Sequence, residues 1–424
     1  MIPPVARSPV LDRGAVRERY VRVRAQTESL VLPLSAEDMM VQSMPDASPT
    51  KWHLGHTTWF FEEFVLARFG VGHKWHDERW RVLFNSYYDS VGPQFSRSMR
   101  GLLSRPSTGE IRKWRARVDE QVIELLARAD PEALAVTLLG THHEQQHQEL
   151  ILTDMKHAMS VNPTGPHYLI EKTPPAPAGR DLSLGWLEYP ETLAPIGHEG
   201  DAFAFDNEGP CHRALVGPFR IASRLVTNAE YARFIDDRGY ERPELWLSDG
   251  WACQKEGGWR APLYWEGEGS QRRTFTMRGM VALDLHAPVT HLSFYEADAY
   301  AHWCGARLPT EEEWEVTASG LPIEGNFVES GVFAAAPADG LSGGAAQFFG
   351  DAWEWTASAY LPYPRFRPLQ GALGEYNGKF MSGQMVLRGG SCFSPRDHLR
   401  ATYRNFFPPH TRWQVSGVRL AKDV

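Results

Sequence analysis

The sequence predicts an α+β protein of two domains, a helical bundle followed by a loop-rich α+β domain. Apolar residues recur at helical spacing through residues 12–161. Residues 162–180 carry five prolines and two glycines, a composition typical of an extended, semi-rigid linker. From residue 181 to residue 424, Gly, Trp and Pro are frequent and helical patterns are few, which favours short strands joined by long loops. A chain of 424 residues can bury a core in each domain.

Overall composition excludes several classes of protein. The net charge of −8 and the pI near 6.1 argue against a nucleic acid as partner. The four cysteines are scattered without a CxxC pair, which predicts a reduced, cytoplasmic protein. The N-terminal segment lacks a continuous apolar stretch, so we expect no signal peptide, and no apolar run approaches the roughly 20 residues that span a bilayer. We therefore expect no membrane partner, and self-association into homo-oligomers is left open.

Caps and apolar periodicity place the helices of the bundle. Asp12 is a good N-cap for a first helix. Ser48 followed by Pro49 predicts the start of a second helix, with the proline at the first helical position. Amphipathic helices are also predicted over residues 109–128 and 130–159. Four helices in about 150 residues predict a bundle with a site between facing helices. In the second domain, helical patterns are seen over residues 223–238 and 293–305.

Histidines on two of these helices are candidate metal ligands. His143 and His147 are four residues apart and share one helix face. Two neutral imidazoles at this spacing can bind one ion of iron, zinc, copper or nickel, although surface histidines also give this pattern by chance. His56 lies on the apolar face of the second helix. A histidine there is usually a core residue, and it becomes a candidate third ligand because another helix offers two imidazoles. His53 is a weaker candidate.

Two sets of motifs resemble known families. The residues WHLGH (52–56) and HEQQH (143–147) resemble the DinB-like helical bundle, in which three histidines bind one metal ion. The second domain resembles the formylglycine-generating-enzyme (sulfatase-modifying factor) fold, a C-type-lectin-like α+β domain. Its motifs are VTNAEY (226–231), PVTHLS (288–293), ARLPTEEEW (306–314), GDAWEWT (350–356), LRGGS (387–391) and SGVRL (416–420). The fusion of both domains is similar to the ergothioneine-biosynthetic sulfoxide synthases, which are non-haem iron enzymes.

This resemblance implies oxygen-dependent formation of a C–S bond. In the family, Fe(II) and the co-substrate O2 join a thiol to the imidazole ring of Nα-trimethylhistidine (hercynine), and the sulfur is oxidised to a sulfoxide. The resemblance implies that His56, His143 and His147 are the iron ligands. Three neutral histidines leave about three positions of an octahedral ion for thiolate, imidazole and oxygen. Zinc or copper would bind at least as tightly, so the choice of iron follows from the resemblance alone.

The resemblance also implies substrate-binding residues. Gln146 corresponds to a contact with the histidine-derived substrate. Arg97 and Arg100 correspond to the arginines that hold the carboxylates of the thiol donor, which suits the bidentate geometry of guanidinium. Asn405 is expected to bind the hercynine carboxylate, and Phe406 to face its trimethylammonium group. Each residue also has a plain structural interpretation, as a solvent-facing amide, a solvated basic surface or a packed ring.

The identity of the thiol donor depends on one replacement. Family members that use γ-glutamylcysteine carry an Asn-Trp-Asp triplet where this chain has Asn405-Phe406-Phe407, and the acid takes the amine of the donor. Since Phe407 stands in place of that aspartate, cysteine is the predicted donor, with γ-glutamylcysteine as the alternative.

Catalysis also requires a proton donor, and the phenol of tyrosine is suitable. Better-known members place this tyrosine in the second domain, where Tyr376 is the nearest candidate. We favour Tyr87 and Tyr88 of the first domain as a pair at the site. The alternative is that one of the two packs in the core and the other is exposed.

Other functions stay open at the level of sequence. HEQQH also fits the HExxH pattern of zinc hydrolases, with Glu144 as general base. A formylglycine-generating enzyme uses a pair of cysteines after Gly-Gly-Ser, whereas only Cys392 follows that motif here. A binding module without chemistry is a third alternative, and ovothiol-type synthases, which act on unmethylated histidine, are a fourth. Structural calcium in the second domain is not determined by the sequence.

Overall fold

The computed structural model describes residues 11–168, 182–341 and 344–424, which fall into two compact units. The first unit comprises the chain up to Ala158 together with Glu199–Phe205 and Pro368–Tyr376. The second unit comprises Met159–His198, Asp206–Arg367 and Asn377–Val424. Two short segments from the later part of the chain thus belong to the first unit. Of the expected linker 162–180, residues 169–180 lie outside the described residues.

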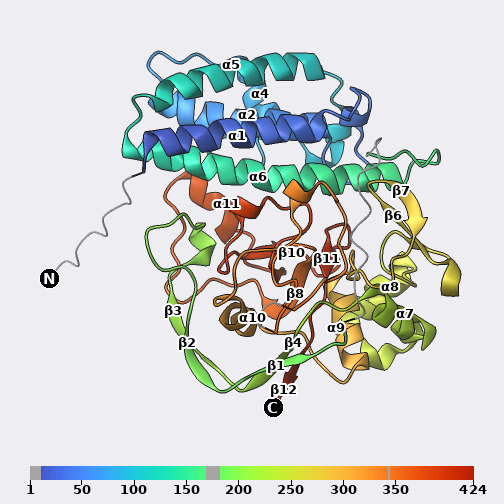
Figure 1. Ribbon diagram of the computed structural model, residues 1–424. Coiled ribbons are helices and arrows are strands. Elements are labelled where there is room, and N and C mark those ends of the chain that lie inside the picture. The colour runs from blue at the N-terminus through green and yellow to red at the C-terminus, as the bar shows by residue number, and fades with distance from the viewer. Residues whose placement is uncertain (1–10, 169–181, 342–343) are drawn as a thin grey trace. The chain divides into compact units, whose positions relative to one another are not determined.

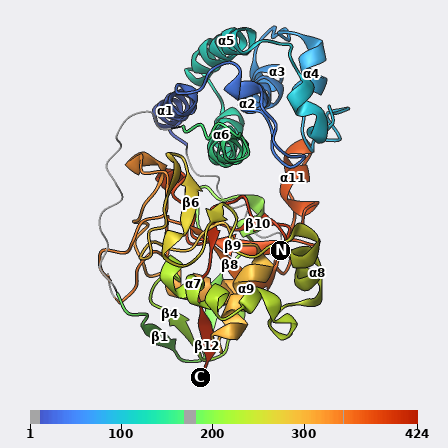
Figure 2. The same ribbon diagram turned by 90° about the vertical axis from the view of Figure 1, so that its right-hand side faces the viewer.

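Four long helices build the first unit, which confirms the expected bundle. They lie side by side in Figure 1, and Figure 2 shows α1 and α6 nearly end on. The long helices are α1 (Arg13–Val31), α2 (Thr50–Phe61), α5 (Thr108–Leu126) and α6 (Pro131–Ser160). The short elements of this unit are η1 (Asp38–Met40), the π-helical turn η2 (Glu62–Leu66), α3 (Ala67–Phe69), α4 (Glu78–Phe84) and η3 (Arg97–Leu102).

The helix starts follow local side-chain chemistry, with one correction. Asp12 caps α1 by accepting a hydrogen bond from the Ala15 amide at 2.8 Å. Helix α2 begins at Thr50, with Pro49 as its N-cap residue rather than its first helical residue. Ser48 makes no cap, because its amide donates to Asp154 Oδ2 at 2.8 Å and its hydroxyl accepts from the buried Arg100 at 2.9 Å. Long-range contacts therefore decide how the chain enters α2.

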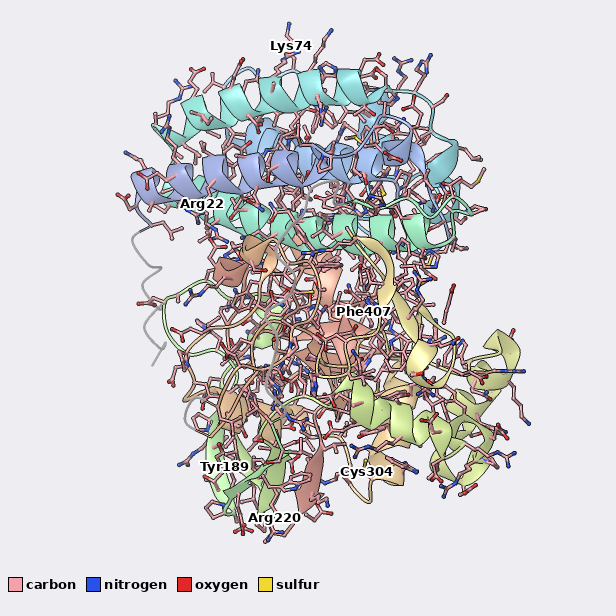
Figure 3. The ribbon with its side chains drawn as sticks, turned by 45° about the vertical axis from the view of Figure 1, so that its right-hand side comes forward. Arg22, Lys74, Tyr189, Arg220, Cys304 and Phe407 are labelled. Atoms are coloured by element: carbon pink, nitrogen blue, oxygen red, sulfur yellow. The ribbon has the colours of Figure 1, made fainter. Side chains whose placement is uncertain are left out.

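The second unit contains four small sheets among its described residues, as expected for a loop-rich α+β domain. Pairing is antiparallel except between β8 and β11. One sheet has the order β10 (Asn405–Phe407), β9 (Met385–Arg388), β8 (Trp353–Ala359), β11 (Ser416–Gly417). The others are β1 (Trp186–Tyr189), β4 (Phe219–Ala222), β12 (Ala421–Asp423); β5 (Trp265–Glu266), β6 (Arg273–Thr276), β7 (Gly279–Ala282); and β2 (Thr192–Ile196), β3 (His212–Val216). Figure 3 labels Tyr189 and Arg220 on the paired strands β1 and β4, and Phe407 at the end of β10.

The helices of the second unit are short. Both expected helical patterns are present, as α7 (Asn228–Asp236) and α9 (Phe294–Trp303). Three further helices were not predicted, namely α8 (Ser248–Gly257), α10 (Glu311–Ala318) and α11 (Glu375–Gly378). The capping box of Thr310 with Glu313 was a readable signal for α10. The remaining turns are η4 (Asp206–Glu208), η5 (Gly239–Glu241), η6 (Pro243–Leu245), η7 (Gly269–Gln271), η8 (Val328–Ser330), η9 (Ala372–Gly374) and η10 (Arg396–His398).

All four cysteines are free thiols. Among the described helices, none combines the length and the hydropathy that a membrane span requires.

Candidate metal centre

Three buried histidines converge inside the bundle. His56 comes from α2, and His143 and His147 come from α6. One ring nitrogen of each lies within 4.8 Å of those of the other two, and the Nε2 atoms of His56 and His143 are 3.2 Å apart. This is the cluster of potential metal ligands found among the described residues, and it comprises the three histidines predicted from the sequence. His53, the weaker candidate, is not part of it.

Neighbouring groups orient the His56 ring. Its Nδ1 donates a hydrogen bond to the Phe84 carbonyl at 2.6 Å, which leaves the Nε2 lone pair for a metal ion. Gly55 permits this contact, because a Cβ at that position would lie 2.2 Å from the Phe84 ring. The ring is stacked on Trp52 and on Trp59, with centroid distances of 4.7 and 5.4 Å.

The electrostatics keep the three imidazoles in the form that binds metal. Burial, reinforced by the proximity of His143, holds the pKa of His56 and of His147 well below the ordinary value. Burial also lowers the pKa of His143 to about 4. All three rings are therefore neutral at neutral pH, with lone pairs available. Three neutral imidazoles form a donor set that fits iron, zinc, copper or nickel.

Glu144 lies on α6 between the ligands in sequence but has a structural role. Its carboxylate accepts hydrogen bonds from Arg24 at 2.9 Å, from Arg115 at 2.5 Å and from the Thr27 hydroxyl at 2.6 Å. Burial favours the neutral acid, but the charges of Arg115 and Arg24 outweigh it and hold the Glu144 pKa at about 2. A carboxylate bound by two guanidinium groups is not available as a general base. These contacts argue against the alternative of an HExxH zinc hydrolase, which needs the Glu144 carboxylate as its base.

Arg100 is a buried cation whose hydrogen bonds to described residues go to two serine hydroxyls. It is 4% exposed, lies 3.3 Å above the Trp52 ring, and donates to the hydroxyls of Ser48 and Ser86 at 2.9 and 3.0 Å. Among the described residues no carboxylate pairs directly with Arg100, although the charge of Asp154 acts on it from farther away, and the Arg100 Nε has no hydrogen-bond partner. Burial and the charge of Arg97 lower the Arg100 pKa to about 9. A buried guanidinium without a counter-ion fits an anionic ligand.

The tyrosines considered from the sequence meet in the first unit. Tyr87 has a left-handed backbone conformation with φ of 66°, and its hydroxyl accepts from Arg97 at 2.7 Å. Its ring is 6.3 Å from that of Tyr376, whose pKa is raised to about 12 by burial and by Tyr87. Tyr88 is buried, and its ring lies 5.5 Å from that of Trp59. The structure thus brings Tyr376, from the later part of the chain, beside the pair of the first domain.

Glu375 holds this tyrosine loop, a role that was not predicted from the sequence. The carboxylate of Glu375 accepts hydrogen bonds from the amides of Asp89 and Ser90 at 2.9 and 3.1 Å. Glu375 precedes Tyr376 and therefore ties that residue to the loop that carries Tyr87. No sequence pattern indicated this contact, because the partners are separated by more than 280 positions.

The other predicted substrate residues are distributed over both units. Gln146 is half-buried on α6. Asn405 and Phe406 lie on β10 in the second unit. The Asn405 side chain accepts from the Phe406 amide at 2.9 Å, and the Phe406 ring stacks on Tyr360 with a centroid distance of 4.1 Å. The preceding Arg404 is bound to a buried carboxylate of α10, which fixes the start of this strand.

Comparisons with known proteins agree with the two-part architecture. Residues 19–159 match the model of the DinB superfamily, and residues 192–424 match that of the sulfatase-modifying factor enzyme 1-like domain. The chain is 32% identical to the Hercynine oxygenase of Mycolicibacterium thermoresistibile, over 98% of this chain and 96% of that protein. It is also 32% identical to the Hercynine oxygenase of Mycolicibacterium smegmatis, over 99% and 100%. A third similar protein is Ergothioneine biosynthesis protein 1 of Schizosaccharomyces pombe, at 30% identity over 52% of this chain and 28% of that protein.

Proposed function

Because the chain belongs to the hercynine oxygenase family, we propose that it uses Fe(II) and O2 to join cysteine to hercynine as hercynylcysteine sulfoxide. Membership of this family makes the chain an oxidoreductase of the ergothioneine pathway, whichever thiol it uses. The observation that carries the proposal is the convergence of three buried, neutral histidines in the bundle. When bound there, iron supplies the oxygen chemistry. The protein supplies the ligands, the substrate contacts and a proton.

The metal ligands of this proposal are His56, His143 and His147, each through one ring nitrogen. As neutral ligands they leave the charge of a divalent ion uncompensated, which favours a thiolate as a further ligand. The aromatic rings packed around His56 keep water from the side of the site that they cover.

The thiol donor is proposed to place its carboxylate at Arg100, assisted by Arg97. The support is that no carboxylate in the described part of the chain pairs directly with Arg100, and burying an unpaired guanidinium is costly. Asn405, Phe406 and Gln146 remain our proposed contacts for hercynine. Phe407 supports cysteine over γ-glutamylcysteine, because a phenyl ring cannot bind the amine of the longer donor as a carboxylate would.

The proton is proposed to come from the tyrosine cluster. Tyr87 and Tyr88 remain our favoured pair, and the hydrogen bond from Arg97 to the Tyr87 hydroxyl supports the first of them. Tyr376 lies close enough to Tyr87 to take part. Replacing both Tyr87 and Tyr88 by Phe is expected to cut sulfoxide formation about 10²-fold, the lower range for general acid catalysis. Unchanged turnover of the double variant, with Tyr376→Phe inactive, would transfer the role to Tyr376.

The direct test is oxygen uptake combined with product mass. Anaerobic protein is loaded with Fe(II), given hercynine with either cysteine or γ-glutamylcysteine, and then exposed to air. We expect the sulfoxide adduct of cysteine. An adduct with γ-glutamylcysteine alone would support the proposed reaction but refute cysteine as the thiol donor. The matched variant is Phe407→Asp, which is expected to gain activity with γ-glutamylcysteine. No uptake despite bound iron, with histidine then accepted in place of hercynine, would indicate the ovothiol-type alternative.

A further inference from the structure

A fourth histidine lies directly behind the proposed ligand His147. The Nδ1 atom of His53 is 2.8 Å from His147 Nδ1, and its Nε2 atom is 3.1 Å from Asp154 Oδ2. The same carboxylate oxygen accepts the Ser48 amide at 2.8 Å. The side chains of His147, His53 and Asp154 are all buried. A continuous hydrogen-bonded path therefore runs from a carboxylate to the metal centre.

The direction of each hydrogen bond follows from its carboxylate end. An ionised carboxylate only accepts, so His53 must carry its proton on Nε2. A neutral imidazole has one N–H, which makes His53 Nδ1 an acceptor. The 2.8 Å contact then requires His147 to donate from its Nδ1. The free lone pair of His147 is consequently on Nε2, the nitrogen left to bind a metal ion.

We propose that His53 and Asp154 act as a positioning relay that fixes the tautomer and ring orientation of His147 for metal binding. This inference rests on the metal centre of the proposed function but not on its substrates. The three ligands differ in their outer partners. His56 has the Phe84 carbonyl, His147 has the relay, and His143 Nδ1 has no hydrogen-bond partner among the described residues.

The relay also brings a negative charge to a site whose ligands are neutral. Glu144 is bound by arginines, whereas Asp154 is linked to a ligand through a single imidazole. Partial transfer of negative charge along the two hydrogen bonds makes His147 a more basic ligand. Loss of such an outer partner typically weakens metal binding 10- to 100-fold.

The test is zinc affinity, measured by competition with a chromophoric chelator in the absence of substrates and oxygen. His53→Leu is expected to weaken zinc binding 10- to 100-fold. His53→Gln is the matched variant, because its amide oxygen can accept from His147 while its NH2 donates to Asp154, and we expect affinity within about threefold of the unchanged protein. Asp154→Asn keeps an acceptor oxygen but removes the charge, so about tenfold weaker binding is expected.

The outcomes separate the relay from other roles. Wild-type affinity in His53→Leu would overturn the relay. Equal losses in His53→Gln and His53→Leu would also overturn it, because the hydrogen bonds of the amide would then contribute nothing to zinc affinity. Wild-type affinity in Asp154→Asn would refute the contribution of its charge. Nitrogen-15 NMR of the zinc-loaded protein should show His147 protonated on Nδ1 and metal-bound through Nε2. Failure of the unaltered protein to bind zinc would instead refute both the assignment of the metal centre and the proposed function that depends on it.

Discussion

Replacing Glu144 by Gln tests whether this residue stabilises the bundle or takes part in chemistry. The carboxylate is fully buried between Arg24 and Arg115, which are 4% and 2% exposed. Without its charge, Arg24 keeps its ion pair with Asp119 at 2.6 Å and Arg115 keeps that with Glu28 at 3.0 Å. The substitution therefore leaves two buried guanidinium groups whose remaining carboxylate partners are both partly exposed, Asp119 at 25% and Glu28 at 40% of the side chain.

The expected loss of stability is about 3 kcal/mol. Breaking a buried ion pair by removing one partner costs roughly 3–5 kcal/mol, and the remaining carboxylates favour the lower end. The pKa of Glu144 gives a consistent figure, since lowering a carboxyl pKa from 4.5 to about 2 corresponds to about 3 kcal/mol.

The assay is urea unfolding followed by helical circular dichroism, which reports mainly on the bundle. The control is Glu132→Gln on the same helix, because Glu132 pairs with Arg68 at an exposed site and its loss should cost less than about 1 kcal/mol. Equal midpoints for the two variants would refute the buried ion-pair network. A stable Glu144→Gln protein that binds zinc normally and loses all turnover would restore a catalytic role for Glu144.

Arg100, the titration of Glu144 and the histidine cluster can each be tested separately. Arg100→Gln should raise the KM for the thiol donor about 10- to 100-fold with a smaller change in kcat, as expected for the loss of a charged hydrogen bond. The control is Arg105→Gln at an exposed position, which should leave steady-state kinetics unchanged. Because the folded pKa of Glu144 lies below its ordinary value, the stability that its charge contributes is complete above about pH 4.5 and is lost as the pH falls towards 2. The urea midpoint of the unaltered protein should therefore drop between these pH values. The midpoint of Glu144→Gln should lack the share of this drop that is due to Glu144. Chelation of bound metal should lower the melting temperature of the bundle. Zinc at 100 times its Kd should restore about 2.7 kcal/mol of unfolding free energy. The His147→Ala variant should melt at the same temperature with and without zinc.

Local patterns were sufficient for much of the fold. The apolar periodicity of 12–161 predicted the helices, Asp12 predicted the cap of α1, and the spacing of His143 and His147 predicted their shared face. These features depend on backbone geometry over one or two turns, which a sequence displays directly. The order of short motifs indicated the second domain, although the sequence contained no strong signal for α8 or α11.

The sequence by itself determined the helices, the three histidines and the family resemblance, whereas the tertiary structure decided what each side chain faces. The HExxH spacing was compatible with Glu144 as a base, and only the position of α1 and α5 showed that arginines occupy its carboxylate. The same holds for the missing counter-ion of Arg100 and for the contact between His53 and His147, which joins positions 94 residues apart. Periodicity specifies which face of a helix is buried, but hydrogen-bond partners and counter-ions come from other elements, and packing alone brings those together.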